Sequence, residues 1–321
     1  MKVKTFCLLL AILVGFTSIS YAQVRDYPKK PIQMIIGHAA GSSVDLFYRL
    51  LADEVSKTWN VPVSAINKTG ASGAVAANEV ANSEKDGCTL LAMLSGQLTT
   101  FSIANPKSPV HVLRDFDPIE MHTYAPIIMF VRADSQFNSL DDIIDYARKK
   151  PGELICGVNQ MGSTSHLETL LLNRLAKIDI TFVHQEGPPQ LMTGVLGGHY
   201  NLGWGNYAFT KPFITAGKIK PLVSDAKCPW KIPTFEEKGY PIALINYMSL
   251  VGPKGTPTTI IKAWEDALHK AMNDPKFQAT LDKAAFVVEM ITGTEKLNKL
   301  LKEEVARYSQ FTPEELGWKQ K

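Results

Sequence analysis

Two segments rich in glycine and hydroxyl side chains carry the clearest chemical signal in this sequence. The first loop reads GHAAGSS (residues 37–43), and the second loop reads GVNQMGSTSH (residues 157–166). Each follows an apolar run and precedes a helical pattern. A helix start offers unpaired N–H groups and the positive end of the helix dipole, which hold a carboxylate or phosphate without lysine or arginine. We interpret both loops as anion-binding segments. Ordinary helix capping by Ser43 and Ser163 is the alternative.

Four further side chains are candidates for the same site. His38 and His166 lie inside the two loops, and Glu186 follows a predicted strand from which it would reach a shared cleft. Trp204 either lines that cleft or fills a core. No two of the seven histidines are three or four residues apart, so the sequence gives no local support for a metal site.

One motif favours an enzyme instead. Residues 203–208 read GWGNYA, which fits the dinucleotide pattern G-x-G-x-x-A, and Asp225 stands at the distance of the acidic residue that holds the ribose. Trp204 is bulky for the tight turn that this pattern requires. The motifs of nucleoside-triphosphate sites, serine hydrolases and zinc peptidases are absent from the sequence. We expect no cofactor, and a secreted α/β enzyme is the third alternative for function.

The elements that would position the loops alternate between short apolar runs and amphipathic helical patterns. The pattern predicts a largely parallel sheet with helices on both faces, repeated in two α/β domains. Residues 23–125 plus 241–321 are expected to form one domain, and residues 126–240 the other. The predicted strands are 32–36, 62–66, 89–94, 154–158, 180–184, 200–204, 219–223 and 287–290. The predicted helices are 44–59, 73–82, 140–149, 163–176, 189–196, 260–272, 276–284 and 295–311.

The first 22 residues read as a signal peptide. Lys2 and Lys4 precede a mostly apolar run, and small residues allow cleavage after Ala22. Cleavage lowers the basic count from 34 to 32 against 31 acidic residues, so nothing in the charge suggests a nucleic-acid partner. Cys88, Cys156 and Cys228 remain, which is too few and too widely spaced for a disulfide scaffold. We expect a periplasmic, soluble monomer.

Eight short segments, in this order, resemble one receptor family over nearly the whole mature chain. They are YPKKPI (27–32), AGSSVD (40–45), NKTGASG (67–73), DGCTLL (86–91), GSTSHL (162–167), LGG (196–198), ITAGK (214–218) and GPKGTP (252–257). Together they are similar to the extracytoplasmic solute receptors of tripartite tricarboxylate transporters, the Bug receptors.

The resemblance implies a type II-like periplasmic-binding-protein clamshell with a ligand cleft between its two domains. It also implies capture of a small carboxylate by backbone, hydroxyl and water contacts, delivery to a membrane permease, and no catalysis. Asp45 matches an aspartate of the family that either holds the first loop or contacts the ligand. The residues that match the family's binding loops are Ala40, Gly41, Ser43, Ser163, Thr164, Ser165 and His166.

This chain departs from the family pattern at several cleft positions. Where the family commonly has Pro-Phe-Pro, residues 37–39 read GHA; Val44 replaces a frequent threonine, residues 183–187 read VHQEG, and Gly205 replaces a frequent aspartate. His38 has two interpretations: a protonated partner of the ligand's charge, or a neutral ring that packs where phenylalanine would lie. A binding module for chemosensing or signalling is the second alternative for function.

Overall fold

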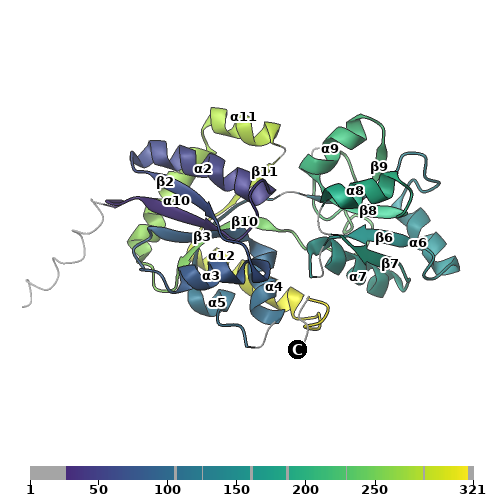
Figure 1. Cartoon of the computed structure of the whole chain (residues 1–321), viewed down its shortest axis with the longest axis horizontal. Coiled ribbons are helices and arrows are strands. Elements are labelled where there is room, and N and C mark those ends of the chain that lie inside the picture. The colour runs from purple at the N-terminus through teal and green to yellow at the C-terminus, as the bar shows by residue number, and fades with distance from the viewer. Residues whose placement is uncertain are drawn as a thin grey trace, which may run out of the picture.

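The computed structural model describes residues 27–104, 107–124, 126–159, 162–185, 188–228, 230–284 and 286–316. Two α/β lobes lie side by side, each built around its own sheet (Figure 1). The predicted signal peptide (1–22) lies outside the described residues. Within the described ranges, no helix is long and apolar enough to cross a bilayer.

The six-stranded sheet of the first lobe has the order β11-β4-β10-β3-β1-β2. Its strands are β1 (Ile32–Ile36), β2 (Val63–Asn67), β3 (Thr89–Leu94), β4 (Phe116–Tyr124), β10 (Tyr247–Pro253) and β11 (Val287–Ile291). Strands β1, β2 and β3 are parallel, whereas β10 and β11 run antiparallel to their neighbours. The carboxyl ends of the three parallel strands therefore meet at one edge, where the first loop lies.

Helices cover both faces of this sheet and enclose two apolar cores. On one face lie α2 (Ser43–Trp59), α10 (Thr258–Met272) and α11 (Pro275–Lys283). On the other lie α3 (Ala74–Ala81), which follows the short 3₁₀ helix η1 (Ala71–Gly73), α4 (Ser95–Ala104), α5 (Val112–Asp115) and α12 (Thr294–Tyr308). In α2, the buried Val44, Phe47, Leu51 and Val55 recur at helical spacing and form the stripe that packs on the sheet.

The second lobe repeats this plan with a five-stranded sheet of order β7-β6-β8-β5-β9. Its strands are β5 (Ile127–Arg132), β6 (Ile155–Val158), β7 (Thr181–His184), β8 (Leu202–Asn206) and β9 (Ile219–Ser224), and its helices are α6 (Leu140–Lys149), α7 (Thr164–Ala176), α8 (Pro188–Leu196) and α9 (Tyr207–Thr215). Strands β6, β7 and β8 are parallel, and β5 is antiparallel to both neighbours. The second loop follows the carboxyl end of β6.

Both sheets are mixed, so the expectation of largely parallel sheets is correct only for β1–β3 and β6–β8. Two of the antiparallel strands, β5 and β10, are the strands by which the chain enters a lobe after a crossing. The chain leaves the first sheet after β4, enters the second as β5, and returns to the first as β10. These three strands, with α4 and α9, are the main elements that the sequence pattern did not predict.

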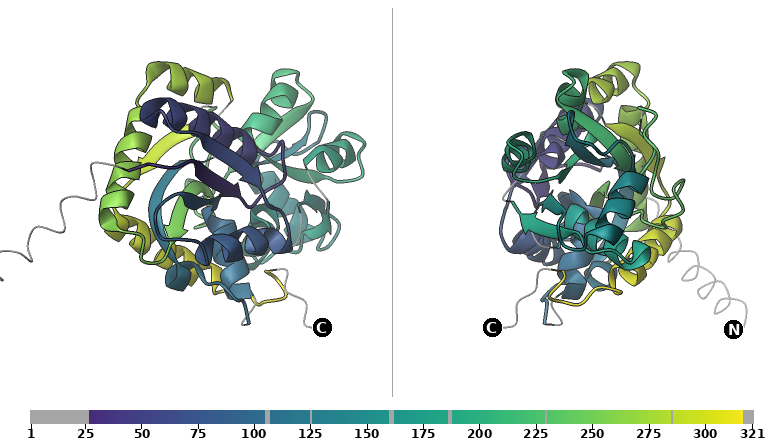
Figure 2. Two further views of the ribbon diagram at one scale, coloured as in Figure 1. Left: turned by 60° about the vertical axis from the view of Figure 1, so that its left-hand side comes forward. Right: turned by 90° about the vertical axis from the view of Figure 1, so that its right-hand side faces the viewer.

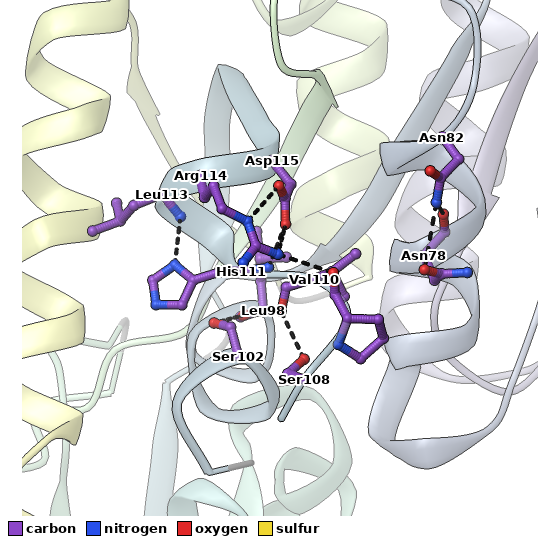
Figure 3. Close-up of polar contacts among 11 residues, drawn as sticks. Asn78, Asn82, Leu98, Ser102, Ser108, Val110, His111, Leu113, Arg114 and Asp115 are labelled. Carbon is purple, nitrogen blue, oxygen red and sulfur yellow. Dashed lines mark hydrogen bonds and ion pairs between the residues drawn. The ribbon is translucent and has the colours of Figure 1, made fainter. Parts of the chain in front are cut away.

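The short helix α5 lies between α4 and β4 in the chain. Its residues form a local network of hydrogen bonds and an ion pair (Figure 3). The imidazole of His111 accepts a hydrogen bond from the Leu113 N–H at 3.3 Å, and Asp115 accepts one from the His111 N–H at 2.7 Å. The Arg114 guanidinium beside Asp115 is the main cause that lowers the pKa of this carboxyl. All these contacts are local, so the network fixes the entry of the chain into β4.

The last residues that the structure describes, those after α12, contact the second lobe. After α12, Phe311 and Leu316 join the core beneath α7, and Glu315 forms an ion pair with Arg174. In Figure 2 this yellow stretch runs along the bottom of the molecule. The tail therefore packs against the lobe opposite to the one that the predicted boundaries give it. The boundaries themselves stay a prediction.

Candidate ligand-binding site

The first loop turns sharply from β1 into α2. Gly41 has φ of +80°, a left-handed conformation that glycine adopts without strain. The helix is capped by Ser42, whose hydroxyl accepts a hydrogen bond from the Asp45 N–H at 3.2 Å. The predicted cap, Ser43, is wrong by one residue. The Ser43 hydroxyl has no hydrogen bond within the described residues, and its side chain is only partly buried.

Asp45 holds the first loop together from the first turn of α2. It is 5% exposed, and its carboxylate accepts hydrogen bonds from the Gly41 N–H at 2.9 Å and from Asn67 Nδ2 at 2.8 Å. Arg49 Nε lies 2.9 Å from the same carboxylate. Burial alone would raise the pKa of Asp45, but these three donors outweigh it and lower the pKa. Of the two roles implied for Asp45, the structure supports holding the loop.

The neighbours of Asp45 differ in how far they are available to a ligand. Ala40 and Gly41 are exposed. The Gly41 N–H, however, points inward to Asp45. Asn67 also donates to the His38 carbonyl at 3.1 Å, so it ties β2 to both sides of the turn. Asn67 belongs to the NKTGASG segment, but its position gave no sign of this bridging role.

His38 is partly buried, and its Nε2 has no hydrogen-bond partner within the described residues. Burial lowers the pKa of His38 to about 4. The imidazole is therefore neutral near pH 7. Of the two interpretations of His38, the structure favours the neutral ring.

The second loop is built from hydroxyl groups that accept hydrogen bonds. Ser163 caps α7 as predicted, and its hydroxyl accepts from the His166 N–H at 3.4 Å. The buried Ser165 hydroxyl accepts from the Asn159 N–H at 3.0 Å. The two serine oxygens lie 3.2 Å apart, so one of the hydroxyls donates to the other.

Thr164 is held by a residue that the sequence analysis missed. Its Oγ1 accepts a hydrogen bond from Nδ2 of Asn246, which lies just before β10 in the segment that returns from the second lobe. The two residues are 82 positions apart in the chain. No local pattern could have linked them.

His166 supports the second loop from inside. It is 2% exposed, its Nδ1 accepts from the Gly162 N–H at 3.0 Å, and its ring lies 4.9 Å from those of Phe182 and His184. Burial, helped by His184, lowers the pKa of His166 to about 4, against the opposing effect of Glu315. A neutral, enclosed imidazole positions the loop and supplies no positive charge to a ligand.

The remaining candidate residues, Glu186, Trp204 and Asp225, are not placed at either loop by the residues that the structure describes. Glu186 lies outside the described residues. Trp204 is fully buried, donates from Nε1 to Thr169 Oγ1 at 3.0 Å and stacks on Phe235. Of its two interpretations, the structure supports the core residue and not the ligand contact. Asp225 is also buried and accepts from the Ile127 N–H at 2.8 Å. The GWGNYA motif therefore forms packed structure in β8 and α9.

The electrostatics of the two loops come from dipoles and hydroxyl groups. Neither loop contains lysine or arginine, and Arg49, the nearest cation described above, pairs with Asp45. Among the described residues, no three histidine, cysteine or acidic side chains gather as a metal ion would require. Cys88, Cys156 and Cys228 are free thiols. The arrangement is suited to holding a small polar ligand.

Two α/β lobes, each with a serine-capped helix at the carboxyl end of a parallel strand, define a two-domain solute-binding protein of the clamshell type. Residues 47–315 match the family model described as the tripartite tricarboxylate transporter family receptor, and the chain belongs to that family. The expected family is confirmed. Its members are periplasmic solute-binding receptors and not enzymes, so the enzyme alternative is set aside.

Individual relatives agree with this assignment. A Cupriavidus necator protein, the UPF0065 protein in the gbd 5' region, is 30% identical over 275 residues, which are 82% of this chain and 80% of that protein. An R. palustris protein solved with adipate is 25% identical, with a TM-score of 0.76 over 91% of this chain and 99% of its own. MatC from Rhodopseudomonas palustris, solved with malate, is 26% identical, with a TM-score of 0.74 over 88% and 99%.

Proposed function

We propose that this receptor captures a small organic carboxylate between its lobes and delivers it to the permease of a tripartite tricarboxylate-type transporter. One observation carries the choice of ligand class. The hydroxyls of Ser163, Thr164 and Ser165 each accept a hydrogen bond from an N–H group, so each keeps its own proton for donation. One serine proton is used between the two serines, which leaves one serine proton and the Thr164 proton for a ligand.

A carboxylate is the natural partner of such a donor set, because an ionised carboxylate only accepts hydrogen bonds. The solved relatives that bind adipate and malate support this class of ligand. Ala40 and Ser43 of the first loop and the three hydroxyls of the second loop are the proposed contacts, with Gly41, Asp45 and His166 shaping the loops. Glu186 stays a predicted contact.

Thermal denaturation of the mature protein, beginning at Gln23, tests this function. The panel contains mono-, di- and tricarboxylates, aromatic acids and amino acids. A carboxylate at 100 times its dissociation constant should stabilise the fold by about 2.7 kcal/mol. The methyl ester of each active compound is the matched control and should give no shift. A panel in which no carboxylate raises the melting temperature would contradict the proposed ligand class.

We further propose that the lobes close on the ligand, with residues 23–125 plus 241–321 and residues 126–240 as the predicted units, except that the stretch after α12 moves with the second lobe because it packs there. Small-angle scattering should then show a smaller radius of gyration with an active carboxylate than without it. Identical profiles would count against closure. N-terminal sequencing of the exported protein tests cleavage after Ala22.

A further inference from the structure

Asn246 occupies the junction between the two lobes. Its Nδ2 donates to Thr164 Oγ1 in the first turn of α7 and lies 3.4 Å from the Leu244 carbonyl oxygen. Both neighbours of this nitrogen are oxygen atoms that accept hydrogen bonds, so the NH₂ group of the amide, and not its oxygen, faces them. The other end of the amide, Oδ1, packs on Gly96 at the start of α4, where a Cβ would clash with it and with the Tyr308 hydroxyl. The side chain therefore lies between two helix starts that belong to opposite lobes.

The segment that carries Asn246 is fixed to the first lobe. The next residue, Tyr247, donates its N–H to Ser95 Oγ at 3.2 Å, and Ser95 in turn contacts Glu304 of α12 at 2.6 Å. Ser95 and Glu304 are both buried. Because this side of the junction is anchored in the first lobe, the Asn246–Thr164 hydrogen bond connects that lobe to the second loop.

The direction of this hydrogen bond matters chemically. A threonine hydroxyl has one proton, and when its oxygen accepts from an amide, that proton is free to point at another acceptor. An aspartate at position 246 would have the same shape but no N–H to donate. The Thr164 proton would then turn toward the aspartate and away from the ligand.

We propose that Asn246 is a positioning residue for anion binding: it turns the Thr164 hydroxyl into a donor toward the ligand and couples this donor to the orientation of the lobes. The inference rests on the proposed function, because it assigns part of the recognition of a carboxylate to Thr164. It places a determinant of affinity outside both loops.

Calorimetry with malate and adipate tests the inference on the mature protein. Asn246→Asp should raise the dissociation constant of a bound probe about tenfold or more, because a donor to a charged group is lost and a negative charge is added. Asn246→Ala, which removes the amide without adding charge, should cost about two- to tenfold. Asn138→Asp is the matched control: it adds the same charge at an exposed position of the second lobe and should bind like the native protein.

A second measurement needs no ligand. In ¹⁵N-labelled protein, the side-chain amide resonance of Asn246 should shift when Thr164→Val removes its acceptor while keeping the side-chain shape. An unmoved resonance overturns the inference even if Asn246→Asp does not fold. If the native protein binds malate or adipate and Asn246→Asp binds it equally well, the inference alone is wrong. If no carboxylate binds the native protein, the proposed function is wrong and the inference falls with it.

Discussion

The first and second loops have the same sequence signature but differ in how many of their hydroxyl groups accept hydrogen bonds from N–H groups. Both join a parallel strand to a serine-capped helix, and both hold a neutral histidine. In the first loop a carboxylate, Asp45, draws the Gly41 N–H inward. The second loop has a similar inward bond, from the Gly162 N–H to His166 Nδ1, but three of its hydroxyl oxygens accept from N–H groups, against one, that of Ser42, in the first loop. Glycine and serine content therefore predicts an anion loop, whereas the internal hydrogen bonds decide how many hydroxyl protons each loop keeps for the proposed carboxylate.

Removing the organising carboxylate of the first loop should have the largest effect. Asp45→Ala removes the acceptor of the Gly41 N–H and one of the two acceptors of Asn67 Nδ2. Loss of these hydrogen bonds to a charged group should lower the free energy of unfolding by about 2 to 3 kcal/mol, measured by urea denaturation. Asp53→Ala, at an exposed position of the same helix, is the control. Equal stability of the two variants would show that Asp45 does not organise the loop.

The helices and strands that carry the loops could be predicted only in part from the sequence. Local patterns predicted β1, β3 and α6 at their observed bounds, because apolar spacing and the Ser139 cap are encoded within each element. Strand β4 was missed because Pro118, Glu120 and His122 break its apolar pattern although the last two side chains are fully buried. His122 lies beneath α2, where its ring contacts those of Phe47 and Tyr48.

The site shows the same limit. The cap at Ser163 is local and was predicted, whereas the choice between Ser42 and Ser43 depends on backbone angles that two adjacent serines do not reveal. Asn246 reaches Thr164 only because the chain crosses back between the lobes. Trp204 was ambiguous because a single aromatic residue near a glycine-rich turn has the same local sequence whether it faces a ligand or a core.

A matched pair of serine variants should sharpen the comparison. Ser165→Ala leaves the Asn159 N–H without its acceptor in a buried position, so it should cost about 1 kcal/mol of stability as well as about tenfold in carboxylate affinity. Ser43→Ala removes a hydroxyl that has no hydrogen bond within the described residues, so stability should change by less than about 0.5 kcal/mol while affinity falls. Chemical denaturation and calorimetry measure both quantities. Similar stability losses for the two variants would contradict the difference drawn between the loops.

The buried histidines should make stability depend on pH in a smaller but definite way. The pKa of His38 is about 4 in the folded protein and about 6.5 when unfolded. As the pH falls from 6.5 to 4, the unfolded chain gains a proton that the folded one does not, so His38 lowers stability over this window. Asp225 and Glu304, whose pKa values are raised to about 7 by burial, act in the opposite direction.

Comparison of variants separates these contributions. His38→Phe should lose less stability than the native protein between pH 6.5 and 4, as measured by urea denaturation at each pH. His269→Phe, at an exposed position of α10, controls for the added phenylalanine. Parallel pH profiles for His38→Phe and the native protein would mean that the imidazole is not buried as described.

The smallest expected effect is on the pH dependence of affinity. Because both loop histidines are neutral, as their lowered pKa values indicate, neither changes charge between about pH 5.5 and 8, and neither should make carboxylate affinity vary over this range. His38→Phe should then bind with the same pH profile as the native protein, displaced by a constant factor if His38 Nε2 bonds to the ligand. A protonated His38 would behave differently: bound carboxylate would raise its pKa, and native affinity would increase as the pH fell through about 6.5 while His38→Phe stayed flat. Calorimetric titrations of both proteins across this range decide between the two, because only a charge partner makes the difference between them vary with pH.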